Sequence, residues 1–386
     1  MSAADEGELL RRWAPVMQYD SHEPYLADHI AILTDHPGNE LRAADGTVIA
    51  TATEQQGLLA LLGPSVYPRS AVTPTRGDHL AEVHGDYQAQ AARMHARPEL
   101  ANRVHGRYVV DEGRRWLQYW FAMYYDDPGI LDFGVHEGDL EMIELELGAD
   151  DLPGTAVYAH HNSGFRVLYG QLDTELTDAG PVPVVYSARG SHASMLRPGH
   201  IRAGSVVTDH NDARGPRLRP DVVVLDPATT PWVLWPGSWG GTRPPDRLEA
   251  DIKIAAYSPF AFGRHHSWSH PSAFAAGCPA PPQLPAPGQP MTLPEPTPSM
   301  PAITVNRSAD QLTIDYDARA AAADGASHIS VAVASPTGNG PALTRSVPLR
   351  GAEQGTITLP APAGDHVVHA TTALPNGTTS ETTTTD

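Results

Sequence analysis

Two acidic residues lie on what the sequence predicts to be the apolar face of a β-strand. Asp139 and Glu141 have the same parity as the isoleucine and leucines of 143–147, and alternate side chains of a strand point to one face. Glu144 and Glu146 have the opposite parity, which predicts a solvated position for both. Burying an ionised carboxylate without a partner is strongly unfavourable. Asp139 and Glu141 are therefore expected to be protonated, paired with arginine or bound to a cation.

A divalent cation is one partner that fits this pattern. Oxygen ligands from two carboxylates suit Ca²⁺, Mg²⁺ or Mn²⁺. An imidazole from His136, at the start of the same strand, shifts the preference towards Mn²⁺, Mg²⁺ or a mixed-ligand iron or zinc site. Asp126 and Asp127, at the end of the preceding aromatic strand, could supply a further oxygen. The predicted metal ligands are therefore His136, Asp139, Glu141, Asp126 and Asp127.

Buried arginines such as Arg166 or Arg189 are the alternative partners of Asp139 and Glu141. Pairing with arginine would satisfy both carboxylates without any metal ion. The His-x-x-Asp-x-Glu spacing alone does not decide between a cation and arginine.

His192 is a further candidate because it follows the strand predicted over 182–188, and a loop at the end of a strand can carry a side chain to a site there. We group it with His136, Asp139 and Glu141 as a catalytic candidate that could move protons. Adjacent side chains on an extended chain point apart, so Ser191 is poorly placed to form a dyad with His192. No Gly-x-Ser-x-Gly elbow is present either, so a serine hydrolase is not expected.

The elements that would position these residues are mostly short β-strands. Residues 116–125 are apolar on both faces, which is typical of a strand in the middle of a packed sheet. Amphipathic or alanine-rich patterns predict helices over 4–13 and 86–102. Further strands are predicted over 139–147, 155–160, 182–188, 222–225 and 232–235. This pattern indicates a mainly β protein, with a β-sandwich core and helical additions over residues 1–275.

The rest of the chain predicts a second, smaller unit. Ten prolines in the 23 residues of 279–301 favour an extended polyproline conformation, and we interpret 276–301 as a linker. Residues 302–376 alternate apolar and polar residues, as in a seven-stranded sandwich of the fibronectin type III or immunoglobulin type. The polar segment 377–386 is expected to be a disordered tail.

Composition excludes several classes of partner. The formal charge is −19, which argues against nucleic acid and anionic membrane surfaces. The single cysteine, Cys278, cannot form an intrachain disulfide, and no run of about 20 apolar residues predicts a membrane span. The first residues lack the pattern of a secretory signal, so a cytoplasmic location is expected unless a signal was removed.

Three motifs together resemble the Vps62-related family: Leu117-Gln-Tyr-Trp-Phe121, His136-Glu-Gly-Asp-Leu-Glu141 and Ala188-Arg-Gly-Ser-His-Ala193. The resemblance extends over roughly residues 8–275. That family is similar in turn to the necrosis-inducing cytolysins, whose β-sandwich holds a divalent metal ion. The resemblance implies that His136, Asp139 and Glu141 are the matching ligands.

The chain also departs from the cytolysin pattern. Glu137, Gly138 and Leu140 replace three other residues of the cytolysin heptad, so toxin activity is not implied. The upstream aspartate of the cytolysins falls at Pro128 here, so Asp126 and Asp127 replace it only approximately.

Three functions are compatible with these patterns. The first is a metal-dependent enzyme that acts on a small, largely apolar molecule by hydrolase, lyase or cyclase chemistry. The second is a metal-stabilised protein that binds a lipid or glycan head group, and the third is a structural or adhesive sandwich protein. A catalytic ion would face a closed apolar pocket, whereas a recognition ion would face a shallow open one. The sequence leaves the reaction, the native metal and the oligomeric state open.

Overall fold

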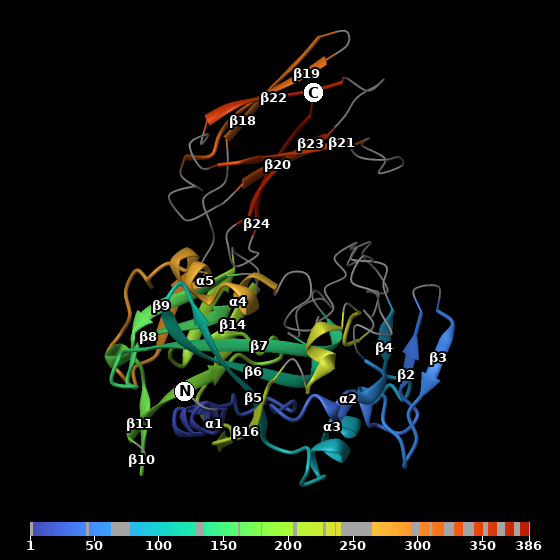
Figure 1. Cartoon of the computed structure of the whole chain (residues 1–386), viewed down its shortest axis with the longest axis vertical. Helices are drawn as coiled ribbons and strands as arrows, with labels where there is room; N and C mark the ends of the chain where they lie inside the picture. Colours follow the sequence, from blue (N-terminus) through green and yellow to red (C-terminus); the bar gives the residue numbers. More distant parts are fainter. Residues whose placement is uncertain are drawn as a thin grey trace.

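The computed structural model describes a mainly β protein (Figure 1). The described residues are 3–43, 46–62, 78–127, 135–160, 163–178, 180–203, 207–226, 229–235, 237–240, 265–294, 302–308, 311–319, 328–334, 343–349, 354–360, 367–373 and 379–385.

A six-stranded sheet forms the centre of the N-terminal part. Its strand order is β16-β5-β6-β7-β8-β9, and all neighbours are antiparallel except β16 and β5. The strands are β5 (Arg103–Asp111), β6 (Arg114–Asp126), β7 (His136–Leu147), β8 (Pro153–His160), β9 (Ser163–Leu168) and β16 (Asp221–Val224). The two strands predicted to carry the site are thus confirmed as the neighbours β6 and β7.

Both faces of β6 are covered, as its apolar sequence predicts. On one face, the Tyr119 hydroxyl donates a hydrogen bond to the Leu10 carbonyl of helix α1 (Ala3–Arg12). On the other face, Trp116 Nε1 lies 3.1 Å from Ser272 Oγ of helix α5 (Pro271–Gly277). Helix α4 (His265–Ser269) covers the same face, where Trp268 lies against Trp120.

This covering corrects the prediction for Glu144, which was expected in solvent. The side chain is fully buried, because Glu144 pairs in register with Gln118 on the face under α4. Burial raises the pKa of Glu144 well above its ordinary value, against the hydrogen bond from Gln118. Strand alternation gave the correct face but could not show that a distant helix covers it. Glu146 is partly exposed.

A second sheet packs against the first to form the sandwich. Its order is β10-β11-β1-β15, with β12 also paired to β11. The Tyr158 hydroxyl of β8 donates to the Val184 carbonyl of β11 across the interface. The strands are β1 (Val16–Gln18), β10 (Thr174–Thr177), β11 (Gly180–Ser187), β12 (Ser194–Met195) and β15 (Arg217–Leu218).

Smaller elements surround this sandwich. Two three-stranded sheets have the orders β3-β2-β4 and β14-β13-β17. Their strands are β2 (Glu40–Arg42), β3 (Val48–Thr51), β4 (His79–Ala81), β13 (Gly199–Ala203), β14 (Val207–Asn211) and β17 (Met291–Pro294). The remaining described helical segments are α2 (Ala31–Thr34), η1 (Leu59–Leu61), α3 (Tyr87–His95), η3 (Tyr169–Gln171) and η4 (Pro231–Leu234).

Two predicted elements differ from the structure. The helix predicted over 86–102 is the shorter α3, because Asp86 caps its start by accepting from the Ala89 backbone N–H and the chain leaves the helix before Pro98. The strand predicted over 232–235 is the 3₁₀ segment η4, which begins at a proline and buries Trp232 and Trp235 in the core.

The predicted linker is also different, since its first part belongs to the N-terminal core. Strand β17 runs parallel to β13 in register, and the side chains of Met291 and Leu293 are buried. The backbone N–H of Arg166 donates to the Pro279 carbonyl. Prolines at sheet edges are compatible with this docking, so the N-terminal unit extends at least to Pro294, and 295–301 lies outside the described residues.

We expect Leu293→Ala in the full chain to lower the free energy of unfolding by about 2–5 kcal/mol, because a buried leucine leaves a cavity. Thr292→Ala, at an exposed position of the same strand, should change it by less than about 0.5 kcal/mol. Urea unfolding measures both. Equal stabilities for the two variants would restore the interpretation of this segment as a free linker.

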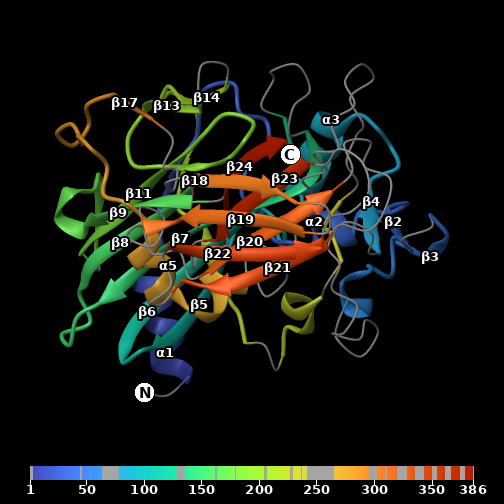
Figure 2. The ribbon, with the colours of Figure 1, turned by 90° about the horizontal axis from the view of Figure 1, so that it is seen from above.

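The C-terminal part has its own apolar core, separate from that of the N-terminal part. Its seven described strands form a three-stranded sheet, β18-β19-β22, and a four-stranded sheet, β21-β20-β23-β24 (Figure 2). They are β18 (Ala302–Arg307), β19 (Gln311–Asp317), β20 (His328–Ala334), β21 (Leu343–Pro348), β22 (Gln354–Pro360), β23 (Val367–Ala373) and β24 (Thr379–Thr385). A small two-sheet sandwich is present, but its seventh described strand, β24, lies beyond the predicted bounds of 302–376. The fibronectin type III or immunoglobulin type stays a prediction.

The tail differs from its prediction. Residues 379–385 pair antiparallel with β23 over their whole length as the edge strand β24. Threonine is β-branched and favours strands, so this polar segment pairs through its backbone although it has few apolar side chains to bury.

Among the described helices, none has the length and apolar character that crossing a membrane requires.

Candidate metal centre

The candidate site lies where β6 ends and β7 begins. Asp126 and His136 are register partners at this end of the sheet, and Asp139 follows three residues later. Two loops complete the site, one after β1 with Glu23 and one between β11 and β12 with His192. All five side chains are buried, so the group is enclosed by chain segments far apart in the sequence.

Gly138 explains how His136 and Asp139 reach the same place. Residues three apart on an unbroken strand point to opposite faces. Gly138 has a φ of +64°, a left-handed conformation that breaks this alternation. A Cβ atom at this position would also lie 2.7 Å from the Trp239 carbonyl oxygen. The glycine of the His-Glu-Gly-Asp motif is therefore required by the backbone of the site.

Asp126, Asp139 and His192 together form the candidate ligand group. One ligand atom from each lies within 4.8 Å of the other two, and His192 Nδ1 is 2.9 Å from Asp139 Oδ2. Two carboxylate oxygens and an imidazole nitrogen are a donor set that Mn²⁺, Mg²⁺ or a mixed-ligand transition metal accepts. The described residues therefore fit a divalent cation.

His136 adds a second imidazole beside Asp126. Its Nδ1 lies 2.6 Å from the Gly138 carbonyl oxygen, an acceptor, so Nδ1 carries the proton of this hydrogen bond. Its Nε2 faces Asp126 Oδ2 at 3.2 Å. Burial lowers the pKa of His136, although Asp139 opposes this effect. A neutral His136 would direct a lone pair at a carboxylate oxygen, and a shared cation would remove that repulsion.

His192 is held between two carboxylates. Its Nε2 lies 3.4 Å from Glu23 Oε1, opposite the contact of Nδ1 with Asp139. Burial acts to lower the pKa of His192, but Glu23 and Asp139 outweigh burial and hold it well above the ordinary value. His192 also has a positive φ of 53°, and the Gly190 backbone N–H donates to Glu23 Oε2 at 2.6 Å. In the metal-free protein the imidazolium thus balances these carboxylates.

Sequence patterns did not identify Glu23. It lies in the loop after β1 without any strand or helix periodicity, and its role depends on how two loops meet. The other loop is fixed by a buried contact, since Ser191 Oγ donates to Asp209 and His160 Nε2 lies 2.9 Å from the same carboxylate. No sequence signal short of a known fold would connect these segments.

Two of the predicted ligands, Glu141 and Asp127, are not among the three residues of the candidate group. Glu141 is buried, lies two residues after Asp139 on β7 and pairs in register with Phe121 of β6. Asp127 is exposed, and its backbone N–H donates to the Gly190 carbonyl. The assignment of Glu141 and Asp127 as ligands stays a prediction.

The two arginines named as alternative partners differ from Asp139 and Glu141 in burial. Arg166 and Arg189 are both exposed, whereas Asp139 and Glu141 are buried. The Asp139 carboxylate lies against the imidazole of His192, and pairing of Asp139 or Glu141 with an arginine stays an alternative prediction.

A second group of possible ligands, Asp20, His22 and Asp212, fits a metal less well. Ser21 and Arg214 both donate to the Asp212 carboxylate, and the His22 side chain is 69% exposed. These carboxylate oxygens join the end of β1 to the chain before β15 and are already used in that connection.

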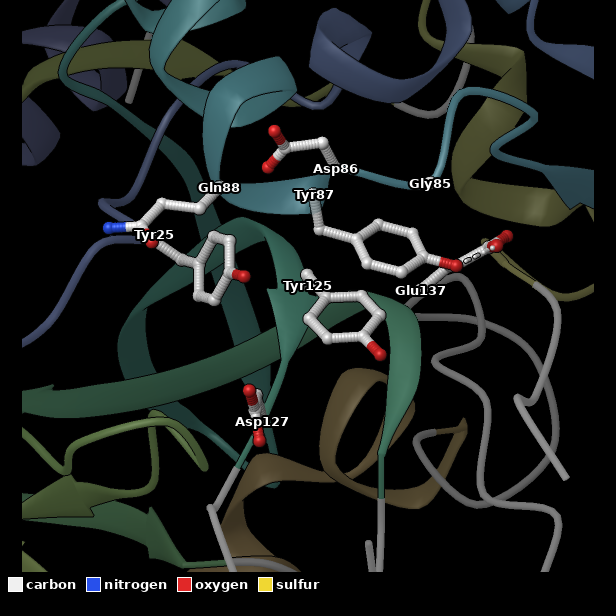
Figure 3. Close-up of a pocket in the computed structure, with 8 residues that line it drawn as sticks. All are labelled: Tyr25, Gly85, Asp86, Tyr87, Gln88, Tyr125, Asp127 and Glu137. Carbon is white, nitrogen blue, oxygen red and sulfur yellow. Dashed lines mark hydrogen bonds between the residues drawn. The ribbon is translucent and has the colours of Figure 1, made fainter. Parts of the chain in front are cut away.

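An open pocket, shown in Figure 3, lies next to His192 of the candidate centre. Its volume is about 750 Å³. Tyr125 and Asp127 line it on either side of Asp126 in the chain, and the Tyr25 ring stands edge-on to the His192 ring with centroids 6.3 Å apart. The other described lining residues are Gly85, Asp86, Tyr87, Gln88 and Glu137. Side chains alternate along β6 and β7, so Tyr125 and Glu137 point to the face opposite Asp126 and His136. The pocket therefore meets the candidate group at His192, through the Tyr25 ring.

The raised pKa of His192 predicts how stability depends on pH without metal. The folded state holds this proton more tightly than the unfolded state, where the pKa is about 6.5. The ion pairs with Glu23 and Asp139 therefore contribute fully below that pH and are lost as pH rises through the folded pKa. Melting of chelator-treated protein from pH 6 to 9 should show falling stability, and His192→Gln should flatten the slope. A slope that His192→Gln leaves unchanged would contradict the assignment.

Comparisons with known proteins give structural likeness only. No protein-family model matches the sequence, and no curated protein does either. The chain is similar to the structures described as NLPPya in complex with mannosamine (14% identity, TM-score 0.31) and with glucosamine (13%, 0.32), each covering 67% of this chain and 86% of the other. Necrosis and Ethylene inducing Protein 2 from the causal agent of cocoa's Witches Broom disease is 11% identical, with 58% and 77% covered and a TM-score of 0.28.

At these TM-scores, function has to be inferred from the residues of this chain. The resemblance to the Vps62-related family stays a prediction.

Proposed function

We propose that this chain is a metal-stabilised binding protein that recognises the polar head group of a glycan or lipid. The observation that supports this proposal best is that His192, a member of the buried group with Asp126 and Asp139, lies against Tyr25, which lines an open pocket of tyrosines and carboxylates. Asp126 and Asp139 would hold the divalent cation with an imidazole nitrogen. Bound there, the ion would supply a fixed positive charge that orders the loops carrying Glu23 and His192.

The character of the pocket favours binding over the enzyme predicted to act on an apolar molecule. Sites for apolar substrates are lined mainly by hydrophobic side chains. The described lining here includes Asp86, Asp127 and Glu137, and Asp86 and Asp127 are exposed. Hydroxyl-rich or charged ligands match such a surface better.

A metal-dependent enzyme remains the second candidate, and one observation favours it. His192 lies fully buried against two carboxylates and next to the pocket, where it could pass a proton to a bound ligand. Under this hypothesis a bound ligand would be converted to a product in the presence of Mg²⁺ or Mn²⁺.

Ligand binding with and without the metal tests the proposal. Mannosamine and glucosamine are suitable first probes, alongside a panel of free glycans and of phospholipid head groups. Ligand-observed NMR should detect binding of a probe to protein loaded with Mg²⁺ or Ca²⁺, which are used in place of Mn²⁺ because they are diamagnetic. A chelator should weaken the binding of the probe. The same spectra followed over hours would reveal product formation. Absence of binding to every probe, with the metal present, would overturn the proposal.

A further inference from the structure

The adjoining pocket has an aromatic wall built from three separate elements. Tyr25 comes from the loop after β1, Tyr87 is the first residue of α3, and Tyr125 is near the end of β6. The rings of Tyr87 and Tyr125 stack with centroids 3.8 Å apart, and the Tyr25 ring is inclined by 60° to Tyr125 at 5.7 Å. Figure 3 shows the three rings side by side, with carboxylates on opposite sides of them. A ligand would therefore meet more than one aromatic ring.

Three carboxylates belong to the same pocket. Asp86 caps α3, Asp127 follows β6, and Glu137 accepts from the Tyr87 hydroxyl at 2.9 Å. Among the described lining residues there is no lysine, arginine or histidine. Burial raises the pKa of both Tyr25 and Tyr87. The negative charge of Asp127 raises the pKa of Tyr25 further, and that of Glu137 raises the pKa of Tyr87 further.

This combination selects among ligand classes. An anion would be repelled by the three carboxylates. An inorganic divalent cation needs converging oxygens, but neither of the two candidate metal groups in the described part of the chain includes Asp86, Asp127 or Glu137. An organic ammonium group uses both features, since its charge interacts with carboxylates and its alkyl surface lies against the faces of aromatic rings.

We propose that the pocket of Tyr25, Tyr87 and Tyr125 binds an organic ammonium cation. This inference rests on the proposed function, because it treats the pocket as the ligand site, but it does not require the metal. Two sources share this chemistry: the quaternary ammonium of a choline-type lipid head group and the protonated amine of an amino sugar.

Neutral counterparts of the same shape test the charge. The uncharged isostere of choline is 3,3-dimethylbutan-1-ol, and that of glucosamine is glucose. In the full chain, at least one of the two charged ligands should bind about tenfold more tightly than its neutral counterpart. A tenfold difference is within the range of cation–π and ion-pair contributions. The choline arm indicates a lipid source, and the glucosamine arm indicates an amino sugar. Equal affinity within both pairs would overturn the inference.

Matched variants test the residues. Asp86→Asn removes a charge but keeps a good helix cap, so it should lower ammonium affinity several-fold while the protein stays folded. Tyr87→Phe keeps the ring and should retain most of the affinity, whereas Tyr87→Leu should lose it. Glu175→Gln, at a carboxylate paired with Arg217 outside the pocket, is the control. Equal affinity in Tyr87→Leu and Tyr87→Phe would contradict an aromatic contact.

Metal titration of the same samples separates the two proposals. Binding of Mn²⁺ without any preference for ammonium ligands would overturn this inference and leave the metal centre intact. A preference for ammonium ligands in protein that binds no divalent cation would uphold the inference and overturn the metal centre.

Discussion

Asp139→Asn should lower the affinity for a divalent cation by more than about 100-fold, because even the loss of a residue behind a ligand usually reduces metal affinity 10- to 100-fold. Asp139 is a member of the only buried candidate group in the described part of the chain and carries one of its two carboxylates. Isothermal titration of chelator-treated protein with Mn²⁺ measures the change.

Two variants control this measurement. Asp212→Asn removes a carboxylate from the second, more exposed group and should leave the affinity of the main site unchanged. Glu141→Gln tests the ligand that the sequence predicts but the geometry leaves outside the group, and a loss comparable to that of Asp139→Asn would add it to the site. Retention of full affinity in Asp139→Asn would show that the ion binds elsewhere.

His192→Gln should destabilise the metal-free protein by about 3–5 kcal/mol, the usual loss when one partner of a buried ion pair is removed. The imidazolium lies 2.9 Å from Asp139 and 3.4 Å from Glu23, all three buried. Its removal leaves these carboxylates without the positive charge between them. Urea unfolding at pH 6, where His192 is protonated in the folded state, gives the largest difference.

A divalent cation should reverse part of this loss, because it returns positive charge to Asp139, which belongs to the candidate ligand group, but not to Glu23, which is outside it. His22→Gln is the matched control, since His22 lies beside Asp20 but its side chain is largely exposed, and surface pairs contribute little. If saturating Mn²⁺ leaves His192→Gln as unstable as before, the loss reflects packing rather than charge.

The strands of the site could be predicted because their signals are local. The aromatic run of 116–125 and the alternating acids of 139–147 identify β6 and β7, and the buried position of Asp139 and Glu141 follows from strand parity. The fate of Glu144 could not be predicted in the same way. Its burial depends on α4, which is more than a hundred residues away in the sequence.

The composition of the site shows the same division. His136 and Asp139 share one motif, and Gly138 bends it into a site through a backbone conformation that only glycine adopts easily. Glu23 and His192 arrive on loops, and nothing in either local sequence specifies that they meet. The misassigned linker and tail have a related cause, since β17 and β24 are formed by pairing with distant strands rather than by local apolar patterns.

The most direct test of the metal centre is electron spin echo spectroscopy of Mn²⁺ bound to the full chain. Two imidazoles, of His136 and His192, lie beside the carboxylates of Asp126 and Asp139, so Mn²⁺ held there should have a nitrogen ligand. We predict one Mn²⁺ per chain with nuclear modulation from a directly coordinated imidazole nitrogen, lost when His136 and His192 are both changed to glutamine. Stoichiometric Mn²⁺ without nitrogen modulation, or no bound Mn²⁺ at all, would contradict the account.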